Sequence, residues 1–252
     1  MNKEECEKHL ILKCYAGSIT YGTNTRDSDV DIRGIVIPPK EYWLGLSSFE
    51  QYVSKDDEFD ITYFGIKKFF NLALNANPNI LELLFLRENH YLWKDTPYKK
   101  LGMRLIENRH IFLSKKCRHS FMGYAYAQFR RMDKLNKNVG QNQKRKDSFE
   151  KFGYDTKNAL HLLRLARQAI EILTEGELYV FRHDAQQLLD VKEGKYTYDE
   201  LVEQFEHYER LVEEAYVHSP LPHKPDYDKA NELLIELVEE YFEEELRRRY
   251  ID

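Results

Sequence analysis

Two predicted strands that flank a short polar connection near the N-terminus constrain this chain most. Residues 10–16 are mostly apolar, and the run is short enough to predict a buried strand. The strand ends at Gly17 and Ser18, two small residues that favour a tight turn. In such a turn the backbone N–H groups can face an anion at the start of a following helix. A second strand begins within residues 28–37, so the unit predicts part of a sheet with an anion-facing turn beside it.

Acidic residues mark the start of the second predicted strand. Because side chains alternate along a strand, Asp29, Asp31 and Arg33 are expected on one face of the sheet. The residues between them are apolar and are expected to pack into the core. Two carboxylates about 7 Å apart along one strand face can bind hard, oxygen-seeking cations such as Mg²⁺. This face therefore predicts a cation site.

The Gly17-Ser18 turn followed by Asp29 and Asp31 resembles the signature of the DNA polymerase β-like nucleotidyltransferase superfamily. The resemblance implies an α/β fold, in which a polymerase β-type nucleotidyltransferase domain (a small mixed sheet with helices) is followed by a mostly helical C-terminal half. It also implies that Gly17 and Ser18 hold the triphosphate of a nucleotide. Asp29, Asp31 and a third carboxylate on a later strand would bind two Mg²⁺ ions, with Mn²⁺ as an alternative.

Further segments resemble one branch of that superfamily, the branch associated with RNA ligases in RNA-repair gene neighbourhoods (RlaP-type). They are residues 28–34, residues 38–46, residues 77–85 and residues 152–165. Together the resemblance covers most of residues 10–195. The branch implies transfer of a nucleoside monophosphate from an NTP to an acceptor hydroxyl with release of pyrophosphate. It also implies an RNA end as the acceptor, in RNA repair or processing.

The third carboxylate is expected in a predicted hairpin. Residues 49–54 and 59–63 alternate as strands around a polar turn. Acids in the turn usually just solvate the chain, whereas Asp60 lies within the second strand and matches the family pattern. Asp60 is therefore the predicted third ligand, and Glu58, on the same strand face, is the alternative. The full set of acids that compete for the role is Asp56, Asp57, Glu58 and Asp60.

A predicted helix over residues 156–173 carries a line of basic side chains. Lys157, His161 and Arg164 fall at i, i+4 and i+7, on one helical face. Such a line on an otherwise apolar helix is costly to bury unless a triphosphate, a nucleic-acid phosphate or the acids of the C-terminal segment meet it. We predict that Lys157 binds the nucleotide and neutralises charge on the departing pyrophosphate. Arg33, His161 and Arg164 are predicted to bind substrate, and a hydrogen-bonded core position is the alternative for His161.

Apolar residues at helical spacing predict further helices over residues 65–76, 97–136, 198–216 and 226–250. Pro78 is expected to break the first of them, because proline disfavours helical geometry in the residue before it. Residues 136–149 are polar and basic and predict a loop.

The net charge of −5 over 252 residues is unevenly distributed. Residues 109–167 carry a net charge of +11, and residues 168–252 carry −14. A basic segment beside a polymerase-like motif suits a polyanionic acceptor. The alternative is that the basic and acidic segments pack together and cancel. We predict a catalytic domain over residues 1–108 and a helical domain over residues 109–252, with a basic first part and an acidic tail.

Cysteine usage and hydropathy indicate the compartment. Cys6, Cys14 and Cys117 are odd in number and widely spaced, so they fit neither a disulfide framework nor a zinc site. No apolar run is long enough to span a bilayer, and a cytoplasmic protein without a membrane partner is expected. The sequence leaves open the preferred NTP, the acceptor and the oligomeric state. The alternative functions are nucleotidylation of a protein or small molecule, and nucleotide binding without turnover.

Overall fold

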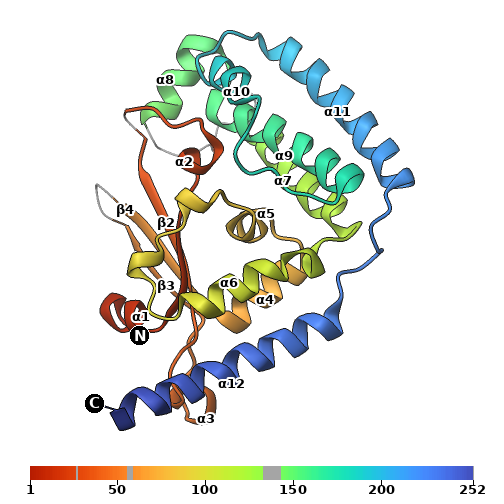
Figure 1. The fold of residues 1–252 in the computed structure, drawn as a ribbon. Helices are drawn as coiled ribbons and strands as arrows, with labels where there is room; N and C mark the ends of the chain where they lie inside the picture. Colours follow the sequence, from red (N-terminus) through yellow and green to blue (C-terminus); the bar gives the residue numbers. More distant parts are fainter. Residues whose placement is uncertain (27, 56–58, 133–142, 252) are drawn as a thin grey trace. The chain divides into compact units, whose positions relative to one another are not determined.

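The computed structural model describes residues 1–26, 28–55, 59–132 and 143–251, with all their side chains except those of residues 143–145 and 249–251. Figure 1 shows the elements in chain order. The strands within these residues are β1 (Leu10–Ala16), β2 (Val30–Val36), β3 (Gln51–Lys55) and β4 (Phe59–Gly65). The helices are α1 (Lys3–Lys8), α2 (Ser18–Tyr21), α3 (Glu41–Leu44), α4 (Ile66–Leu74), α5 (Pro78–Leu81), α6 (Lys99–Glu107), α7 (Lys116–Met132), α8 (Gln143–Phe152), α9 (Thr156–Glu175), α10 (Ala185–Lys192), α11 (Tyr198–His218) and α12 (Tyr227–Ile251). Short 3-10 helices are η1 (Glu82–Leu84), η2 (Glu88–His90), η3 (Trp93–Asp95) and η4 (Arg109–Phe112).

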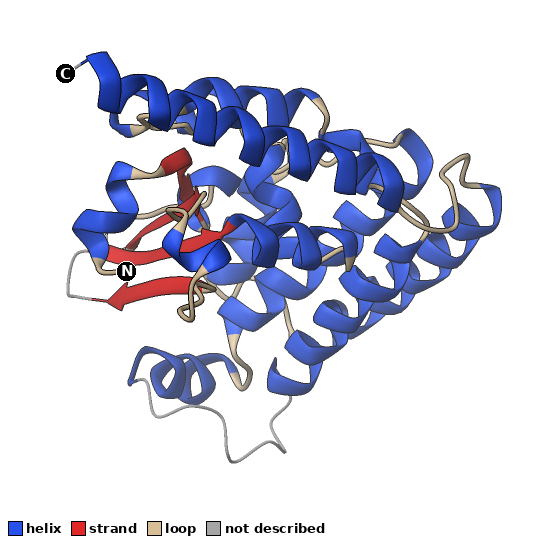
Figure 2. Ribbon diagram, turned by 90° about the horizontal axis from the view of Figure 1, so that it is seen from below, coloured by secondary structure: helices blue, strands red, loops and turns tan. Residues whose placement is uncertain are grey.

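The strands form one mixed sheet in the order β1-β2-β4-β3. β1 pairs antiparallel with β2, β2 pairs parallel with β4, and β3 pairs antiparallel with β4 as the predicted hairpin requires. Figure 2 shows the strands as one layer in a chain that is otherwise mostly helical. The predicted fold class, a small mixed sheet with helices and a mostly helical C-terminal half, is confirmed.

The two faces of the sheet differ in chemistry. One face is apolar, where Ile32 of β2 and Tyr63 of β4 pack with Cys6 of α1 in a buried cluster. Because side chains alternate along each strand, the opposite face receives Asp31 and Arg33. The strand period predicted from the sequence therefore separates a core face from a polar face.

The outer strand β1 is covered closely by α6, because a glycine lets the two backbones meet. A Cβ built on Gly102 would lie 2.0 Å from the backbone oxygen of Ile11, closer than real Cβ contacts. The backbone N–H of Tyr98, just before α6, donates to the carbonyl of Leu10 at 3.1 Å. Any larger residue at position 102 would push α6 away from the sheet.

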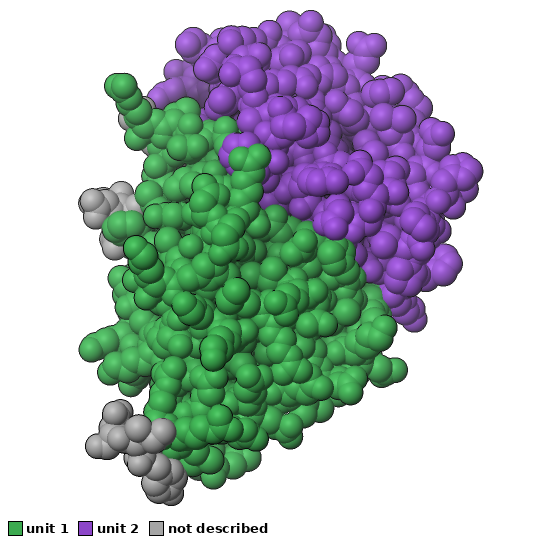
Figure 3. Space-filling view, viewed as in Figure 1, with its two compact units in different colours: residues 1–75, 79–112, 225–252 green, residues 76–78, 113–224 purple. Residues whose placement is uncertain are grey.

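The chain divides into two compact units, coloured separately in Figure 3. Unit 1 comprises residues 1–75, 79–112 and 225–252, and unit 2 comprises residues 76–78 and 113–224. The sheet and the C-terminal helix α12 thus belong to the same unit, although residues 113–224, which lie between them in the sequence, build the other.

Helix α12 is joined to the sheet unit by polar contacts from several elements. Arg104 of α6 forms ion pairs with Glu236 and, at 3.0 Å, with Glu240. The hydroxyl of Tyr241 lies 2.7 Å from Nδ1 of His9, which follows α1. Two acids of the acidic C-terminal segment therefore hold this helix against α6.

Unit 2 is built around α9, which packs against α7, α8, α10 and α11. The helix begins where the sequence predicts, because the side chain of Asp155 accepts a hydrogen bond from the backbone N–H of Asn158 at 3.0 Å. It ends at Gly176, which has a left-handed conformation. None of the helices in the described parts of the chain is long and apolar enough to cross a membrane.

The predicted loop over residues 136–149 is partly wrong, since α8 covers Gln143–Phe152. Residues 133–142 lie outside the described residues. The α8 segment is rich in Lys and also contains Arg, Gln and Glu, all of which favour helices in spite of their polarity. Ser148 of α8 donates through Oγ to the carbonyl of Tyr154 at 3.0 Å, which fixes the helix beside the start of α9.

Candidate active site

The register of the sheet places the predicted acids of β2 and β4 next to each other. Asp31 is the Cα partner of Asp60 in the parallel pair of strands. On the two flanks, Ala16 pairs with Asp31 and Lys55 pairs with Asp60. Neighbouring strands lie about 4.8 Å apart, so both carboxylates belong to one row across the sheet. Each carboxylate side chain is 27% exposed, which leaves it reachable from solvent.

One guanidinium joins the two carboxylates. Arg33 donates through Nη2 to Oδ1 of Asp31 at 3.2 Å and through Nη1 to Oδ1 of Asp60 at 3.1 Å. Nη1 also donates to the backbone carbonyls of Asp60 at 2.7 Å and Ile32 at 3.0 Å. The contacts to backbone carbonyls anchor the guanidinium in the sheet, independently of the two side chains.

The predicted Gly17-Ser18 turn lies directly against Asp31. Gly17 has φ +64°, and a Cβ built there would lie 2.4 Å from Oδ2 of Asp31. The short helix α2 follows, with the Thr20 hydroxyl donating to the carbonyl of Gly17 at 2.8 Å. Glycine is therefore required for two reasons, a positive φ and the close approach of a carboxylate.

Asp29 lies just before β2, which begins at Val30, and its side chain is exposed. The preceding chain forms a turn in which Oγ of Ser28 accepts from the backbone N–H of Thr25 at 2.9 Å. The strand predicted to contain all three residues therefore contains Asp31 and Arg33, with Asp29 at its entrance.

The predicted third acid, Asp60, lies inside β4 as expected. Its Oδ1 meets Arg33, and its Oδ2 lies 4.0 Å from Nζ of Lys55. The alternatives Asp56, Asp57 and Glu58 lie outside the described residues.

Asp31 and Asp60 fit a divalent cation in the kind of donor they supply. Both offer carboxylate oxygens, the ligands that Mg²⁺ prefers, and Oδ2 of Asp31 occupies the space left by the missing side chain of Gly17. Within residues 1–26, 28–55, 59–132 and 143–251, no group of three or more His, Cys, Asp or Glu side chains is arranged to hold a metal ion. The described arrangement is thus a carboxylate pair with Asp29 nearby in sequence, and two cations, Arg33 and Lys55, offset the charge of the pair.

A cavity of about 420 Å³ opens beside this row. Gly17, Asp31 and Arg33 line it at the row, and residues of α2, β3, β4, α5 and η1 line most of the rest. Sequence analysis did not identify these further residues, because the exposure of Gln51 and Val53 on one face of β3 is evident only in the fold. The size is typical of a small-molecule site.

Glu82 closes part of the cavity wall and is 4% exposed. Oε2 of Glu82 accepts a hydrogen bond from the hydroxyl of Tyr21 at 2.7 Å. Tyr21 ends α2, so this buried bond joins the Gly17-Ser18 turn to η1 within unit 1. Glu82 therefore has a hydrogen-bond partner within the fold.

The predicted basic line of α9 belongs to unit 2 and runs from solvent into the interior. Lys157 is exposed, His161 is half-buried, and Arg164 is 3% exposed and donates to Oε1 of Gln168 at 2.9 Å. Their roles towards a nucleotide or substrate stay predictions.

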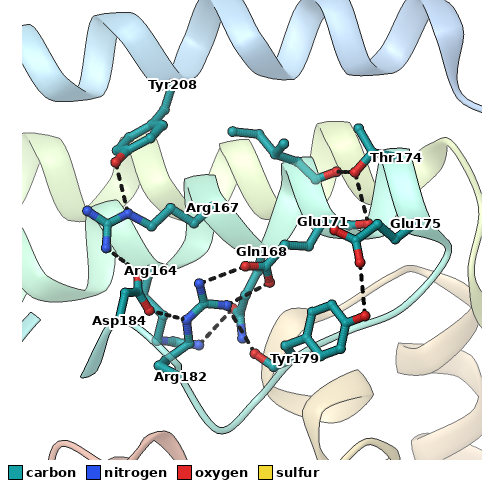
Figure 4. A network of polar contacts seen from close by, with 11 residues as sticks. Arg164, Arg167, Gln168, Glu171, Thr174, Glu175, Tyr179, Arg182, Asp184 and Tyr208 are labelled. Atoms are coloured by element: carbon teal, nitrogen blue, oxygen red, sulfur yellow. Dashed lines mark hydrogen bonds and ion pairs between the residues drawn. The ribbon is translucent and has the colours of Figure 1, made fainter. Parts of the chain in front are cut away.

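Arg164 borders a buried network of ion pairs drawn in Figure 4. Arg182, whose side chain is fully buried, makes two hydrogen bonds to the carboxylate of Glu171 at 2.6 and 2.7 Å, and its Nε donates to Asp184 at 2.9 Å. Arg167 also pairs with Asp184 and donates to the hydroxyl of Tyr208 at 3.0 Å. The network ties the segment after α9 to α9 itself and to α11.

The three cysteines are buried and free, which excludes them as nucleophiles. Burial raises the pKa of the Cys6 and Cys117 thiols to about 11. Burial also raises the pKa of Cys14, whose Sγ lies 3.7 Å from the carbonyl oxygen of Arg33. A thiol rather than a thiolate is expected at each position near neutral pH.

Comparison with known proteins gives three findings. A family model described as the RNA repair pathway DNA polymerase beta family matches residues 2–236. An uncharacterised 38.9 kDa protein of the nrdC–mobD intergenic region of Enterobacteria phage T4 is 29% identical over 128 residues, which cover 47% of this chain and 37% of that protein. The solved structure of a nucleotidyltransferase-like protein from Exiguobacterium sibiricum aligns over 95% of this chain and 74% of its own, with 15% identity and a TM-score of 0.27.

Proposed function

This chain belongs to the RNA repair pathway DNA polymerase beta family, and from that membership we propose that it transfers a nucleoside monophosphate from an NTP to a hydroxyl of an RNA end. Pyrophosphate is the leaving group. The observation that carries the proposal is the row of Asp31 and Asp60, with Gly17 against Asp31. Paired carboxylates beside a tight glycine turn suit metal-assisted attack on a phosphate.

Asp29, Asp31 and Asp60 are the residues that would hold Mg²⁺ or Mn²⁺. Bound there, divalent cations lower the pKa of the acceptor hydroxyl and offset phosphate charge. The chain itself contributes preorganisation, because the β2–β4 register fixes Asp31 and Asp60 in adjacent positions before any ligand arrives.

Arg33 is assigned to positioning these carboxylates, and the direct substrate contact predicted from the sequence stays the alternative. Its bonds to the carbonyls of Ile32 and Asp60 hold the guanidinium in place. The guanidinium of Arg33 donates hydrogen bonds to Oδ1 of Asp31 and to Oδ1 of Asp60. The other oxygen of each carboxylate lies elsewhere: Oδ2 of Asp31 faces Gly17, and Oδ2 of Asp60 lies on the side of Lys55. One oxygen of each carboxylate is thereby oriented by the guanidinium.

Gly17, Ser18 and Lys157 are assigned to the nucleotide, and His161 and Arg164 to the substrate. The name of the family and the net charge of +11 on residues 109–167 support an RNA acceptor. In that segment Arg130, Arg131, Lys146 and Lys151 are exposed. Arg118, in contrast, forms an ion pair with Glu213, so part of the basic charge is offset by the acidic part of the chain. The buried free cysteines support the cytoplasm as the compartment.

The test is transfer of label from α-³²P NTPs to separate pools of RNA, protein and small molecules, with pyrophosphate release followed in parallel. Label in the RNA pool, lost in Asp31→Asn, is the expected result. Label only in the protein or small-molecule pool would show that the acceptor is a protein or a small molecule and not RNA. Nucleotide binding without pyrophosphate release would show that the chain binds nucleotides without transferring them.

A further inference from the structure

The cavity beside the carboxylate row has two chemically distinct parts. At the row it is lined by Gly17 and by the charged side chains of Asp31 and Arg33. Away from the row, along β3 and β4, it is lined by Gln51, Val53, Thr62 and Phe64. That second part, which we call the neutral part, holds no charged residue of these two strands.

The neutral part lies on the same sheet face as the acids, further along the strands. Val53 pairs with Thr62, and Gln51 pairs with Phe64. Phe64 follows Asp60 by four residues, about 13 Å along β4 at the strand rise. A nucleotide with its phosphate at the row can therefore extend its base towards Gln51.

The wall chemistry of the neutral part suits a flat, uncharged ligand. Val53 is 56% exposed, an unusual state for a valine in a strand, and Phe64 is half-buried beside it. The carboxamide of Gln51 and the hydroxyl of Thr62 lie among these apolar surfaces. Asn79 adds a second carboxamide to the lining of the cavity, and the buried Glu82 already accepts a hydrogen bond from Tyr21.

We propose that the neutral part binds a nucleobase, which lies on Val53 and Phe64 and presents its hydrogen-bonding edge to Gln51. This inference rests on the proposed nucleotidyl transfer. Bases stack on apolar and aromatic side chains, and carboxamides recognise base edges through paired donor and acceptor groups. The base belongs either to the incoming NTP or to the terminal nucleoside of the RNA acceptor.

The test fills the neutral part without touching the charged row. Val53→Trp adds bulk at an exposed edge-strand position, so the fold is expected to survive. Val217→Trp is the matched control, since Val217 is 67% exposed on α11 of unit 2. Gln51→Leu is the second variant, which keeps the volume and removes the hydrogen bonds. Circular dichroism and thermal unfolding establish that each variant is folded.

Three probes separate the sources of the base: the four NTPs, inorganic tripolyphosphate, and short homopolymeric oligoribonucleotides. If the base is that of the NTP, Val53→Trp changes NTP binding by about tenfold or more, to weaker binding where the indole takes the volume of the base and to tighter binding where the base stacks on it, and leaves tripolyphosphate binding unchanged. Gln51→Leu then narrows the differences in affinity among the four NTPs. If the base is that of the acceptor, NTP binding is unchanged and oligoribonucleotide binding weakens instead.

Either pattern supports the nucleobase site. Equal binding of all three probes to wild type, Val53→Trp and Gln51→Leu overturns it, as does the same change in Val217→Trp. These outcomes are read from binding, so they are distinct from the failure of the proposed function, which would appear as wild-type protein that binds NTPs and releases no pyrophosphate.

Discussion

Oδ2 of Asp31 lies where the side chain of Gly17 would be, 2.4 Å from the position of a Cβ built on that glycine. Gly17 also has φ +64°. The turn and the carboxylate therefore depend on each other, and neither position tolerates a larger neighbour.

Gly17→Ala is expected to abolish transfer and to destabilise the protein by about 1–3 kcal/mol, because the methyl group meets both a carboxylate and an unfavourable φ. Gly123→Ala is the control. A Cβ at Gly123 of α7 meets nothing within 4 Å, so that variant should be unchanged or up to about 1 kcal/mol more stable. Urea unfolding and pyrophosphate release measure both effects, and a fully active Gly17→Ala would contradict the role of the turn.

Asp31→Asn and Asp60→Asn should each reduce kcat by several orders of magnitude, since metal assistance supplies several kcal/mol of transition-state stabilisation. The thermal midpoint should change little. The acids are partly exposed and already offset by Arg33, and exposed ion pairs contribute about 0–1 kcal/mol. Activity retained in Asp60→Asn but lost in Glu58→Gln would transfer the role of the third acid to Glu58.

Arg33→Lys and Arg33→Gln should both lower kcat by about 100-fold with little change in the KM for NTP, because only a planar guanidinium can span four acceptors. The apparent Mg²⁺ requirement should rise as well, since both carboxylates lose their orientation. The contrasting pattern, a higher KM with kcat preserved, would return Arg33 to direct substrate binding. Steady-state kinetics over a range of NTP and Mg²⁺ concentrations distinguish the two.

Acid should weaken unit 2 through Asp184. Burial alone would raise the pKa of Asp184, but the hydrogen bonds and charges of Arg182 and Arg167 outweigh burial and lower that pKa. A lowered folded-state pKa stabilises the fold above the unfolded pKa of about 3.9, and this stability is lost as pH falls through the folded value. Thermal unfolding between neutral pH and about pH 3 should thus show a steeper loss for wild type than for Asp184→Asn. Asp228→Asn, at an exposed position of α12, is the control.

Arg182→Met should destabilise the protein by about 3–5 kcal/mol, because it leaves the carboxylate of Glu171 without its buried partner and removes one of the two arginines that pair with Asp184. Transfer measured well below the thermal midpoint should persist. A loss of transfer without a loss of stability would indicate that the network contacts substrate.

RNA binding should be sensitive to salt if the basic segment follows a phosphate backbone. The slope of the logarithm of the binding constant against the logarithm of the salt concentration becomes less negative by about 0.7 for each single-strand phosphate contact that is lost. Reversal of Arg130 and Arg131 to Glu should flatten the slope for an oligoribonucleotide, whereas the same reversal of Lys99 and Lys100, exposed on α6, should not. An unchanged slope in both would favour a protein or small-molecule acceptor.

The local parts of this site could be predicted from the sequence. Alternation places Asp31 and Arg33 on one face, and the structure has both in β2. The pairing of Asp31 with Asp60 could not be derived, since it depends on which strands become neighbours across a crossover. For the same reason the contacts of Arg33 with both acids could not be predicted from the sequence.

Boundaries were less predictable than elements. Asp29 was expected inside the strand, but the turn closed by Ser28 and Thr25 delays the start of β2 to Val30. The polar composition of Gln143–Phe152 suggested a loop, although its helix-forming residues and its contact with α9 make it α8. In both cases a local hydrogen bond or a tertiary contact decided what composition left open.

The placement of α12 in unit 1 has a consequence for synthesis of the protein on the ribosome. Arg104 and His9 are translated early, but Glu236, Glu240 and Tyr241, which contact them, are translated only after all of unit 2. A nascent or prematurely terminated chain therefore holds an incomplete unit 1, in which Arg104 and His9 lack their contacts with α12.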